Sequence, residues 1–345
     1  MKEFLQKLSS VCAPSGKEKA LAEVIEKEIA PYCDSITYDK IGNMIALIKP
    51  RKKCERVMLT THMDEIGFMV KNIENDGRIH IVLIGNTDSR TLSGRRVRFL
   101  NGTVGVVTAK AIHMLSEGER GKPTPSDKLF VEIGAKDKAE AETYVKKGDF
   151  GTFEPKFVEM ANETYAGKAL GGRACVLEMI ELIKATHAAK KAKTLAKECY
   201  FVFSVKREIA ARGPFAVTTA AFIIEPDIAI ALDAAPVCDH MGGAKNGAKC
   251  GGGIVLAPAD MRTIYDRSLF ADAIQLCEEK GIAYQHPSST ALPGGESGAI
   301  YHYGGGVKTL SVGIPTRNLH SGAEIVKSSD MKAAATFLGA WLLSE

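Results

Sequence analysis

The chain has 345 residues, of which 45% are hydrophobic and 25% are charged, so it can bury a sizeable core. Its 45 basic and 41 acidic residues leave a net charge of only +4, and no basic run is interleaved with aromatic residues, which argues against nucleic acid as a partner. The N-terminal segment MKEFLQKLSSVCAPSG has no continuous apolar stretch, so we expect no signal peptide, no membrane anchor and a cytoplasmic protein.

The first part of the chain predicts one helix followed by short strands. Residues 17–29 carry Leu21, Val24, Ile25 and Ile29 at three- and four-residue intervals, which is typical of an amphipathic helix. Strands are expected over residues 35–39, 43–48 and 56–61. From about residue 70 to 162 the pattern changes to short alternating strands, IHIVL, RVRFL, TVGVVTAK and LFVEIG, with Gly-rich turns between them. We expect a small β-rich insert there.

The alternation of helix and apolar strand resumes after the insert, which is the α/β pattern. Helices are predicted over residues 173–190, 214–223 and 268–280 and from residue 329 onward, and strands over 199–205, 227–232 and 307–312. The glycine-rich segment 242–253 lacks the strand-then-helix context of a phosphate-binding loop, so we expect a mobile loop. The prediction is an α/β domain formed by residues 1–70 and 163–345, interrupted by a β-rich domain of residues 71–162.

The eight cysteines are scattered singly along the chain without a CxxC pair, so reduced thiols are expected. Cys175, Cys199 and Cys277 lie in apolar segments and are predicted to be core residues.

Side chains that can bind metal follow four of the predicted strands. His62 and Asp64 come directly after the strand 56–61, and a carboxylate near a metal-binding histidine can fix its tautomer. Glu208, Asp233 and His320 end or follow three further strands. Each one alone is more typical of a solvated strand end. Open α/β sheets build their sites at the carboxyl ends of strands, so together these residues predict one shared site.

Six segments make the sequence resemble the tetrahedral (glutamyl) aminopeptidases, a family of co-catalytic dinuclear metallopeptidases also labelled endoglucanase-type or cellulase-like. They are HMDEIG at 62–67, GKALGGR at 167–173, FSVKREIAARG at 203–213, IALD at 230–233, GGESGA at 294–299 and IPTRNLHS at 314–321. Their order and spacing match over nearly the whole chain. The resemblance implies a mixed-sheet, zinc-peptidase-like core sandwiched by helices, with the insert as a barrel-like domain for dimerisation and oligomerisation.

The resemblance also implies a site for two divalent ions, zinc or cobalt. His62 and Asp233 match the ligands of one ion, and Glu208 and His320 match the ligands of the other. Asp64 matches the residue that orients His62. Glu296 and Ser297 match the substrate-binding segment, where the family more commonly has Gly-Gly-Thr-Asp-Ala.

Two positions depart from this pattern. The carboxylate that bridges both ions, in the family motif Lys-Ala-Leu-Asp-Asp/Asn-Arg, falls on Gly171, and the general base falls on Arg207. Arginine cannot accept a proton at working pH. Two divalent ions about 3.5 Å apart repel by about 19 kcal/mol at an effective dielectric constant near 20, so losing the carboxylate between them should weaken dinuclear binding severely. We therefore expect one metal ion or none.

Two details of this site stay open. Arg207 is expected either to pair with Glu208 or Asp233 or to turn out to solvent. Asp239 and His240 are weaker candidates for substitute ligands.

The resemblance implies a metalloaminopeptidase that removes N-terminal residues from short peptides by metal-activated water, with activity weak or lost. It also implies a homo-oligomer built from dimers, up to a dodecamer. The alternative is a non-catalytic paralogue that binds peptides or assembles with an active aminopeptidase subunit. A glycosidase would need two carboxylates flanking the sugar bond, and the sequence does not isolate such a pair.

Overall fold

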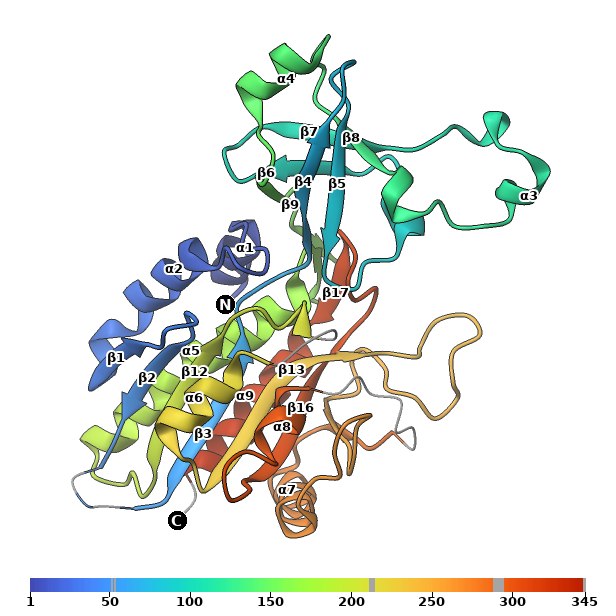
Figure 1. The fold of residues 1–345 in the computed structure, drawn as a ribbon. Coiled ribbons are helices and arrows are strands. Elements are labelled where there is room, and N and C mark those ends of the chain that lie inside the picture. Colours follow the sequence, from blue (N-terminus) through green and yellow to red (C-terminus); the bar gives the residue numbers. More distant parts are fainter. Residues whose placement is uncertain (51, 53, 211–214, 288–294, 344–345) are drawn as a thin grey trace.

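A mixed sheet forms the centre of the molecule (Figure 1). The structure is a computed structural model that describes residues 1–345 except 51, 53, 211–214, 288–294 and 344–345, and within these residues the sheet has eight strands in the order β1-β2-β12-β3-β13-β16-β14-β15. The strands are β1 (Ser35–Tyr38), β2 (Met44–Ile48), β3 (Arg56–His62), β12 (Glu198–Ser204), β13 (Ile228–Pro236), β14 (Ile254–Leu256), β15 (Tyr284–Gln285) and β16 (Lys308–Thr316). β12, β3, β13 and β16 are parallel neighbours, so their carboxyl ends lie at one edge of the sheet.

Helices cover both faces of this sheet (Figure 1). Val57 and Leu59 of β3 belong to the largest core cluster, whereas Met58 between them belongs to a second cluster, as the period of two along a strand requires. The first cluster is completed by α1 (Lys2–Ser10), α2 (Lys19–Ile29), α5 (Leu170–Lys191), α7 (Arg267–Lys280) and α9 (Ser328–Leu343). The second is completed by α6 (Val217–Ile224) and α8 (Glu296–Ile300). The predicted helix-sandwiched core is confirmed.

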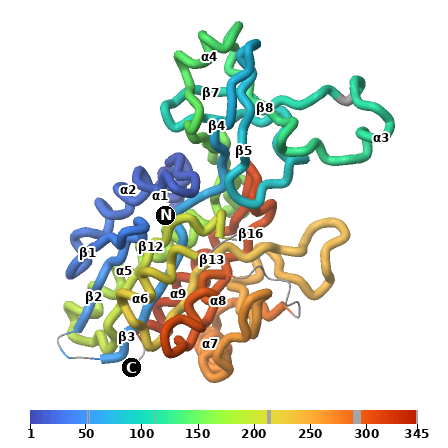
Figure 2. Tube along the Cα trace, in the orientation of Figure 1, coloured from blue at the N-terminus to red at the C-terminus, as the bar shows by residue number. Residues whose placement is uncertain are grey.

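A closed barrel is inserted between β3 and the rest of the core. Its strands follow the order β4-β5-β8-β7-β6-β9: β4 (Gly67–Ile73), β5 (Ile79–Ile84), β6 (Arg96–Phe99), β7 (Val104–Thr108), β8 (Phe130–Glu132) and β9 (Phe150–Phe153). The barrel has its own apolar core and carries α3 (Glu117–Arg120) and α4 (Lys138–Tyr144). Position 151 requires glycine, because a Cβ there would lie 2.3 Å from Cζ of Phe68. Figure 2 shows the barrel standing beyond one end of the core.

A small antiparallel sheet connects the barrel to the site. It consists of β10 (Val158–Met160), β11 (Thr164–Gly167) and β17 (Glu324–Lys327), in that order. β11 leads directly into α5, and β17 leads directly into α9. Short 3₁₀ turns complete the secondary structure: η1 (Ala30–Tyr32), η2 (Ser89–Thr91), η3 (Ile112–Met114) and η4 (Ser126–Lys128).

Most of the predicted elements are present, and the differences are local. The sequence analysis missed α1, which buries Leu5 and Leu8 against the core. The helix predicted from residue 173 begins at Leu170, so Gly171 and Gly172 lie in its first turn. The helix predicted over 214–223 begins at Val217, and residue 214 lies outside the described residues.

The predictions for the cysteines and for the glycine-rich segment also have counterparts in the structure. Cys175, Cys199 and Cys277 are buried, as predicted. Residues 242–253 form turns and bends without a helix or strand, and their predicted mobility stays a prediction. None of the helices in the described part of the chain is long and apolar enough to cross a membrane.

Candidate functional site

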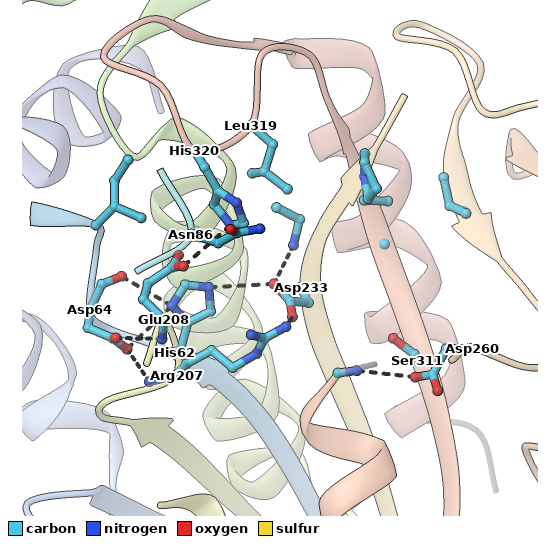
Figure 3. Close-up of a pocket in the computed structure, with 18 of the residues that line it drawn as sticks. His62, Asp64, Asn86, Arg207, Glu208, Asp233, Asp260, Ser311, Leu319 and His320 are labelled. Atoms are coloured by element: carbon cyan, nitrogen blue, oxygen red, sulfur yellow. Dashed lines mark hydrogen bonds and ion pairs between the residues drawn. The ribbon is translucent and has the colours of Figure 1, made fainter. Parts of the chain in front are cut away.

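The carboxyl ends of the parallel strands bring the four predicted metal ligands together in one pocket of about 400 Å³ (Figure 3). His62 ends β3, Glu208 follows β12, Asp233 lies near the end of β13, and His320 follows β16. Arg207 lines the same pocket. The four positions are far apart in sequence and meet because parallel strands end at the same edge of a sheet.

His62 lies between two carboxylates. Its Nδ1 is 3.5 Å from Oδ1 of Asp64, and its Nε2 is 3.5 Å from Oδ1 of Asp233. Burial alone would lower the pKa of His62, but hydrogen bonds and charge from Asp233 and Asp64 raise that pKa well above its ordinary value. The contacts with Asp233 and Asp64 thus favour the protonated ring, and Nδ1 also lies 3.1 Å from the backbone oxygen of Asp64.

Asp64 also fixes the turn after β12. Its carboxylate oxygens accept hydrogen bonds from the backbone N–H groups of Arg207 and Glu208, each at 2.9 Å, and from the hydroxyl of Ser15. Asp64 is 1% exposed; burial raises its pKa, but hydrogen bonds and charge from His62, together with hydrogen bonds from Ser15 and Glu208, lower it below its ordinary value. The predicted contact between Asp64 and His62 is present, and the same carboxylate holds the backbone of the residue predicted at the position of the base.

Arg207 points into the pocket and pairs with Asp233. Its Nη2 lies 3.2 Å from Oδ2 of Asp233, and the two side chains are 16% and 18% exposed. The guanidinium also stacks over Phe215 at 5.3 Å from the ring centroid. Although burial opposes ionisation, Arg207 and His62 lower the pKa of Asp233 well below its ordinary value. Of the two outcomes that the sequence left open for Arg207, the structure has the pairing with Asp233.

Glu208 and His320 form the other half of the pocket. Oε2 of Glu208 is 3.3 Å from Nε2 of His320. Burial raises the pKa of Glu208 to about 7 and lowers the pKa of His320.

Glu324, which the sequence analysis missed, lies behind this pair. Its two oxygens accept hydrogen bonds from the backbone N–H groups of His320 and Gly171, both at 2.9 Å. Burial raises its pKa to about 7. Its position four residues after His320, at the start of β17, was the only signal in the sequence.

The two glycines at the start of α5 differ in what they face. A Cβ on Gly171 would lie 2.6 Å from Cβ of Ala234 and 2.9 Å from Oγ1 of Thr316. A Cβ on Gly172 would lie 3.2 Å from Cε1 and 3.4 Å from Nε2 of His62. Gly172 lines the pocket together with His62. The bridging position assigned to Gly171 stays a prediction, and in this backbone the side chain that would face His62 belongs to residue 172.

The predicted substrate residues Glu296 and Ser297 lie behind the pocket wall. Glu296 is 3% exposed and accepts hydrogen bonds from the hydroxyls of Thr60, at 2.6 Å, and Ser204. Ser297 is buried and donates to the hydroxyl of Tyr265 at 3.2 Å. Their role toward a substrate stays a prediction. Residue 294 and residues 211–213 of the motifs lie outside the described residues.

The weaker candidates Asp239 and His240 are not gathered into the pocket. Asp239 pairs with Arg317, with one oxygen 3.0 Å from Nε, and accepts the backbone N–H of Cys250. His240 is exposed, and its Nδ1 faces the carbonyl oxygen of Met241. Both residues lie in the loop that follows β13.

A buried ion triad supports the floor of the site. Nζ of Lys168 is 2.6 Å from Oε1 of Glu65, and Nη2 of Arg173 is 3.4 Å from the same oxygen. All three side chains are at most 2% exposed. Arg173 also donates to the carbonyl oxygen of Met63. The triad therefore joins the first turn of α5 to the segment that carries His62.

The residues present do not fit a pair of metal ions. The two side chains predicted to hold one ion, His62 and Asp233, contact each other, and Arg207 supplies a second cation to Asp233. In the part of the chain that the structure describes, no three His, Cys, Asp or Glu side chains are grouped so that they could hold one ion. No carboxylate projects from either Gly171 or Gly172. No reaction step through a metal centre follows from this arrangement.

Comparisons with known proteins agree on the family. The family model described as M42 glutamyl aminopeptidase matches residues 42–337. The lysyl aminopeptidase of Pyrococcus furiosus is 28% identical over 338 residues, which cover 95% of this chain and 93% of that protein.

Solved structures have the same fold over the whole chain. An aminopeptidase from the archaeon Desulfurococcus kamchatkensis superposes with a TM-score of 0.90 at 27% identity, covering 99% of this chain and 94% of its own. The TET1 peptidase of Pyrococcus horikoshii, which can assemble into a tetrahedron or a large octahedral shell, has a TM-score of 0.85 at 28% identity and covers 99% of this chain and 98% of its own.

Proposed function

This chain belongs to the M42 glutamyl aminopeptidase family, and from that membership we propose that its pocket binds the amino-terminal part of short peptides while hydrolysing them weakly or not at all. Family members are aminopeptidases, which are hydrolases, and they generally depend on divalent metal. The proposal concerns what is left of that activity in this chain.

The observation that carries the proposal is the place of Arg207. A general base must accept a proton within hydrogen-bond reach of the attacking water. At the position matched to that base, this chain has a guanidinium 3.2 Å from Asp233, and a guanidinium has no proton-accepting atom. A general base typically contributes about 10² to 10⁴ in rate, so its loss alone accounts for weak turnover.

The pocket retains features suited to a peptide amino terminus. Glu208 presents a carboxylate to it, and an ammonium group of a ligand would find an acceptor there. The pocket is also lined by Val255, Ala257 and Leu319, which can contact an apolar side chain. A concave pocket with apolar walls and a few converging polar groups is the usual form of a small-ligand site.

The metal content belongs to the same proposal. We expect zinc or cobalt to bind at one ion per chain at most, because Arg207 and the missing carboxylate both disfavour a second cation. Added zinc, cobalt or manganese should therefore leave turnover of aminoacyl para-nitroanilides near background. Turnover near 10 per second, about the median for enzymes, would contradict the proposal.

Peptide binding is measured separately by calorimetry with tripeptides and with their N-acetylated forms. Binding that is lost on acetylation supports recognition of the amino terminus. The variant Leu319→Trp should block the pocket, because Leu319 is a half-buried wall residue. Ile41→Trp, at an exposed position in the turn between β1 and β2, is the matched control and should leave binding unchanged.

We also propose a homo-oligomer built from dimers through the barrel, in shells as large as a dodecamer. The support is the likeness to the Pyrococcus horikoshii peptidase, which can assemble into a tetrahedron or an octahedral shell. Light scattering on the purified chain tests this, and a monomer at micromolar concentration would contradict it.

A further inference from the structure

We infer that Arg207 is a built-in cation that keeps divalent metal out of the half of the pocket formed by His62 and Asp233, and that a carboxylate at position 172, not 171, is what this backbone would need to admit one. The inference rests on the proposed function only for the identity of the pocket. It concerns the protein alone, without a peptide.

Both carboxylate oxygens of Asp233 already face a cationic side chain or a hydrogen-bond donor. Its Oδ2 faces Nη2 of Arg207 at 3.2 Å, and its Oδ1 faces Nε2 of His62 at 3.5 Å and accepts the backbone N–H of Ala234 at 2.7 Å. A metal ligand must direct a lone pair at the ion. Binding an ion at Asp233 therefore requires Arg207 or His62 to give way.

Arg207 is held in place and cannot easily give way. Its backbone N–H is bound by Asp64 at 2.9 Å, and its guanidinium lies over the ring of Phe215. A second cation, Arg262, stacks on the same ring with its central carbon 4.8 Å from the centroid. Two guanidinium groups on one aromatic ring at the pocket wall repel an incoming divalent ion, and the low dielectric of a half-buried site strengthens that repulsion.

The glycine pair at the start of α5 decides where a carboxylate could stand. A side chain at 171 would start 2.6 Å from Ala234 and 2.9 Å from Thr316, closer than side-chain atoms pack without a shift. A side chain at 172 would start 3.2 Å from the ring of His62, so it would extend into the pocket beside that ligand. Successive helical residues point about 100° apart, so the two positions cannot replace each other.

The consequence for the protein is a charge balance made without metal. The guanidinium of Arg207 pairs with Asp233, and the ring of His62 lies between Asp233 and Asp64. Removal of metal by a chelator should therefore leave the fold and any ligand binding of this pocket unchanged.

The experiment measures Zn²⁺ binding by the full chain after treatment with a chelator, and uses Co²⁺ absorption to report the ligand geometry. Wild type is compared with Arg207→Glu alone, with Arg207→Glu plus Gly172→Asp, and with Arg207→Glu plus Gly171→Asp as the matched control. We expect wild type to bind weakly, and the pair with Gly172→Asp to bind about 100-fold more tightly than wild type. The pair with Gly171→Asp should bind no more tightly than Arg207→Glu alone.

Several results would overturn the inference. One is tight stoichiometric Zn²⁺ binding by wild type. Another is equal or tighter binding by the Gly171→Asp pair than by the Gly172→Asp pair. Should the double variants fail to fold, as judged by circular dichroism, Arg207→Met decides: it should bind Zn²⁺ about 10-fold more tightly than wild type, and an unchanged affinity counts against the inference.

The outcome is separable from that of the proposed function. A wild-type chain that binds one ion tightly but does not hydrolyse peptides would contradict only the inference. A chain that hydrolyses peptides rapidly without bound metal would contradict only the proposed function.

Discussion

Arg207, which follows β12, and Asp233 of β13 form a largely buried ion pair at the end of the sheet, with Nη2 and Oδ2 3.2 Å apart. Removing one partner of a buried pair leaves the other charge uncompensated, which typically costs 3–5 kcal/mol. Asp233 would keep His62 and the N–H of Ala234, so we expect Arg207→Met to lower the free energy of unfolding by about 2 to 4 kcal/mol in urea at pH 7.

The control for this prediction is Arg262→Met. Arg262 is exposed and stacks on the same ring of Phe215, so its loss should cost less than about 1 kcal/mol. Equal losses for the two variants would mean that the pair with Asp233 does not stabilise the fold.

The two glycines of α5 should respond differently to a methyl group. Gly171→Ala should lower the free energy of unfolding by about 1 to 3 kcal/mol, because the new Cβ would lie 2.6 Å from Ala234. Gly172→Ala should change it by less than about 1 kcal/mol, because the contact with His62 is looser and alanine favours a helix. Denaturant titration of both variants tests the contrast, and the reverse order would contradict it.

The buried triad of Lys168, Glu65 and Arg173 should also be costly to break. Lys168→Met leaves the carboxylate of Glu65, which is 2% exposed, with the longer contact to Arg173 and the N–H of Ala13. We expect a loss of about 3 kcal/mol in the free energy of unfolding.

Lys184→Met is the matched control for the triad. Lys184 pairs with Glu28 and Glu181 near the surface of α5, where ion pairs contribute about 0 to 1 kcal/mol. A loss at Lys168 no larger than the loss at Lys184 would show that Glu65 is compensated without it.

Glu178 on α5 should make stability fall as pH rises. It is 1% exposed, both of its oxygens are buried without a hydrogen-bond partner among the described residues, and burial raises its pKa to about 8 from 4.5. The folded state then holds a proton that the unfolded state releases above about pH 4.5. The contribution of this proton to the free energy of unfolding is therefore complete below that pH. It is lost as pH rises, at about 1.4 kcal/mol per pH unit, up to about pH 8.

The variant Glu178→Gln should remove this slope. The free energy of unfolding of the variant, relative to that of wild type, should increase by roughly 3 kcal/mol between pH 5 and pH 8, as measured by urea unfolding at each pH. The control Glu23→Gln changes an exposed glutamate of α2 and should leave the slope unchanged. A wild-type slope that survives in Glu178→Gln would assign the effect to another group.

Much of the site could be predicted because it depends on strand ends. His62 and Asp233 each follow an apolar run, and apolar runs with turn residues around them are visible in a sequence. Parallel pairing then brings the ends of those runs together. The pairing of Arg207 with Asp233 could be anticipated from charge alone, since a buried carboxylate needs a cation.

The remaining features depend on three-dimensional detail that a pattern does not contain. Whether residue 171 or 172 faces the pocket is set by the residue at which α5 begins, and a shift of one residue turns the side chain by about 100°. Glu324 begins β17, which pairs with β11. That pairing joins segments far apart in the chain and lets Glu324 contact the start of α5 as well as His320. Glu296 lies on the far side of the pocket wall because it begins α8, which packs against the second core cluster.

The barrel enters and leaves the core through adjacent strands, since Phe68 of β4 is paired with Gly151 of β9. The two junctions are thus one strand spacing apart, about 5 Å, which a turn of a few residues can bridge. We therefore expect that the barrel can be excised or exchanged for another module without opening the central sheet.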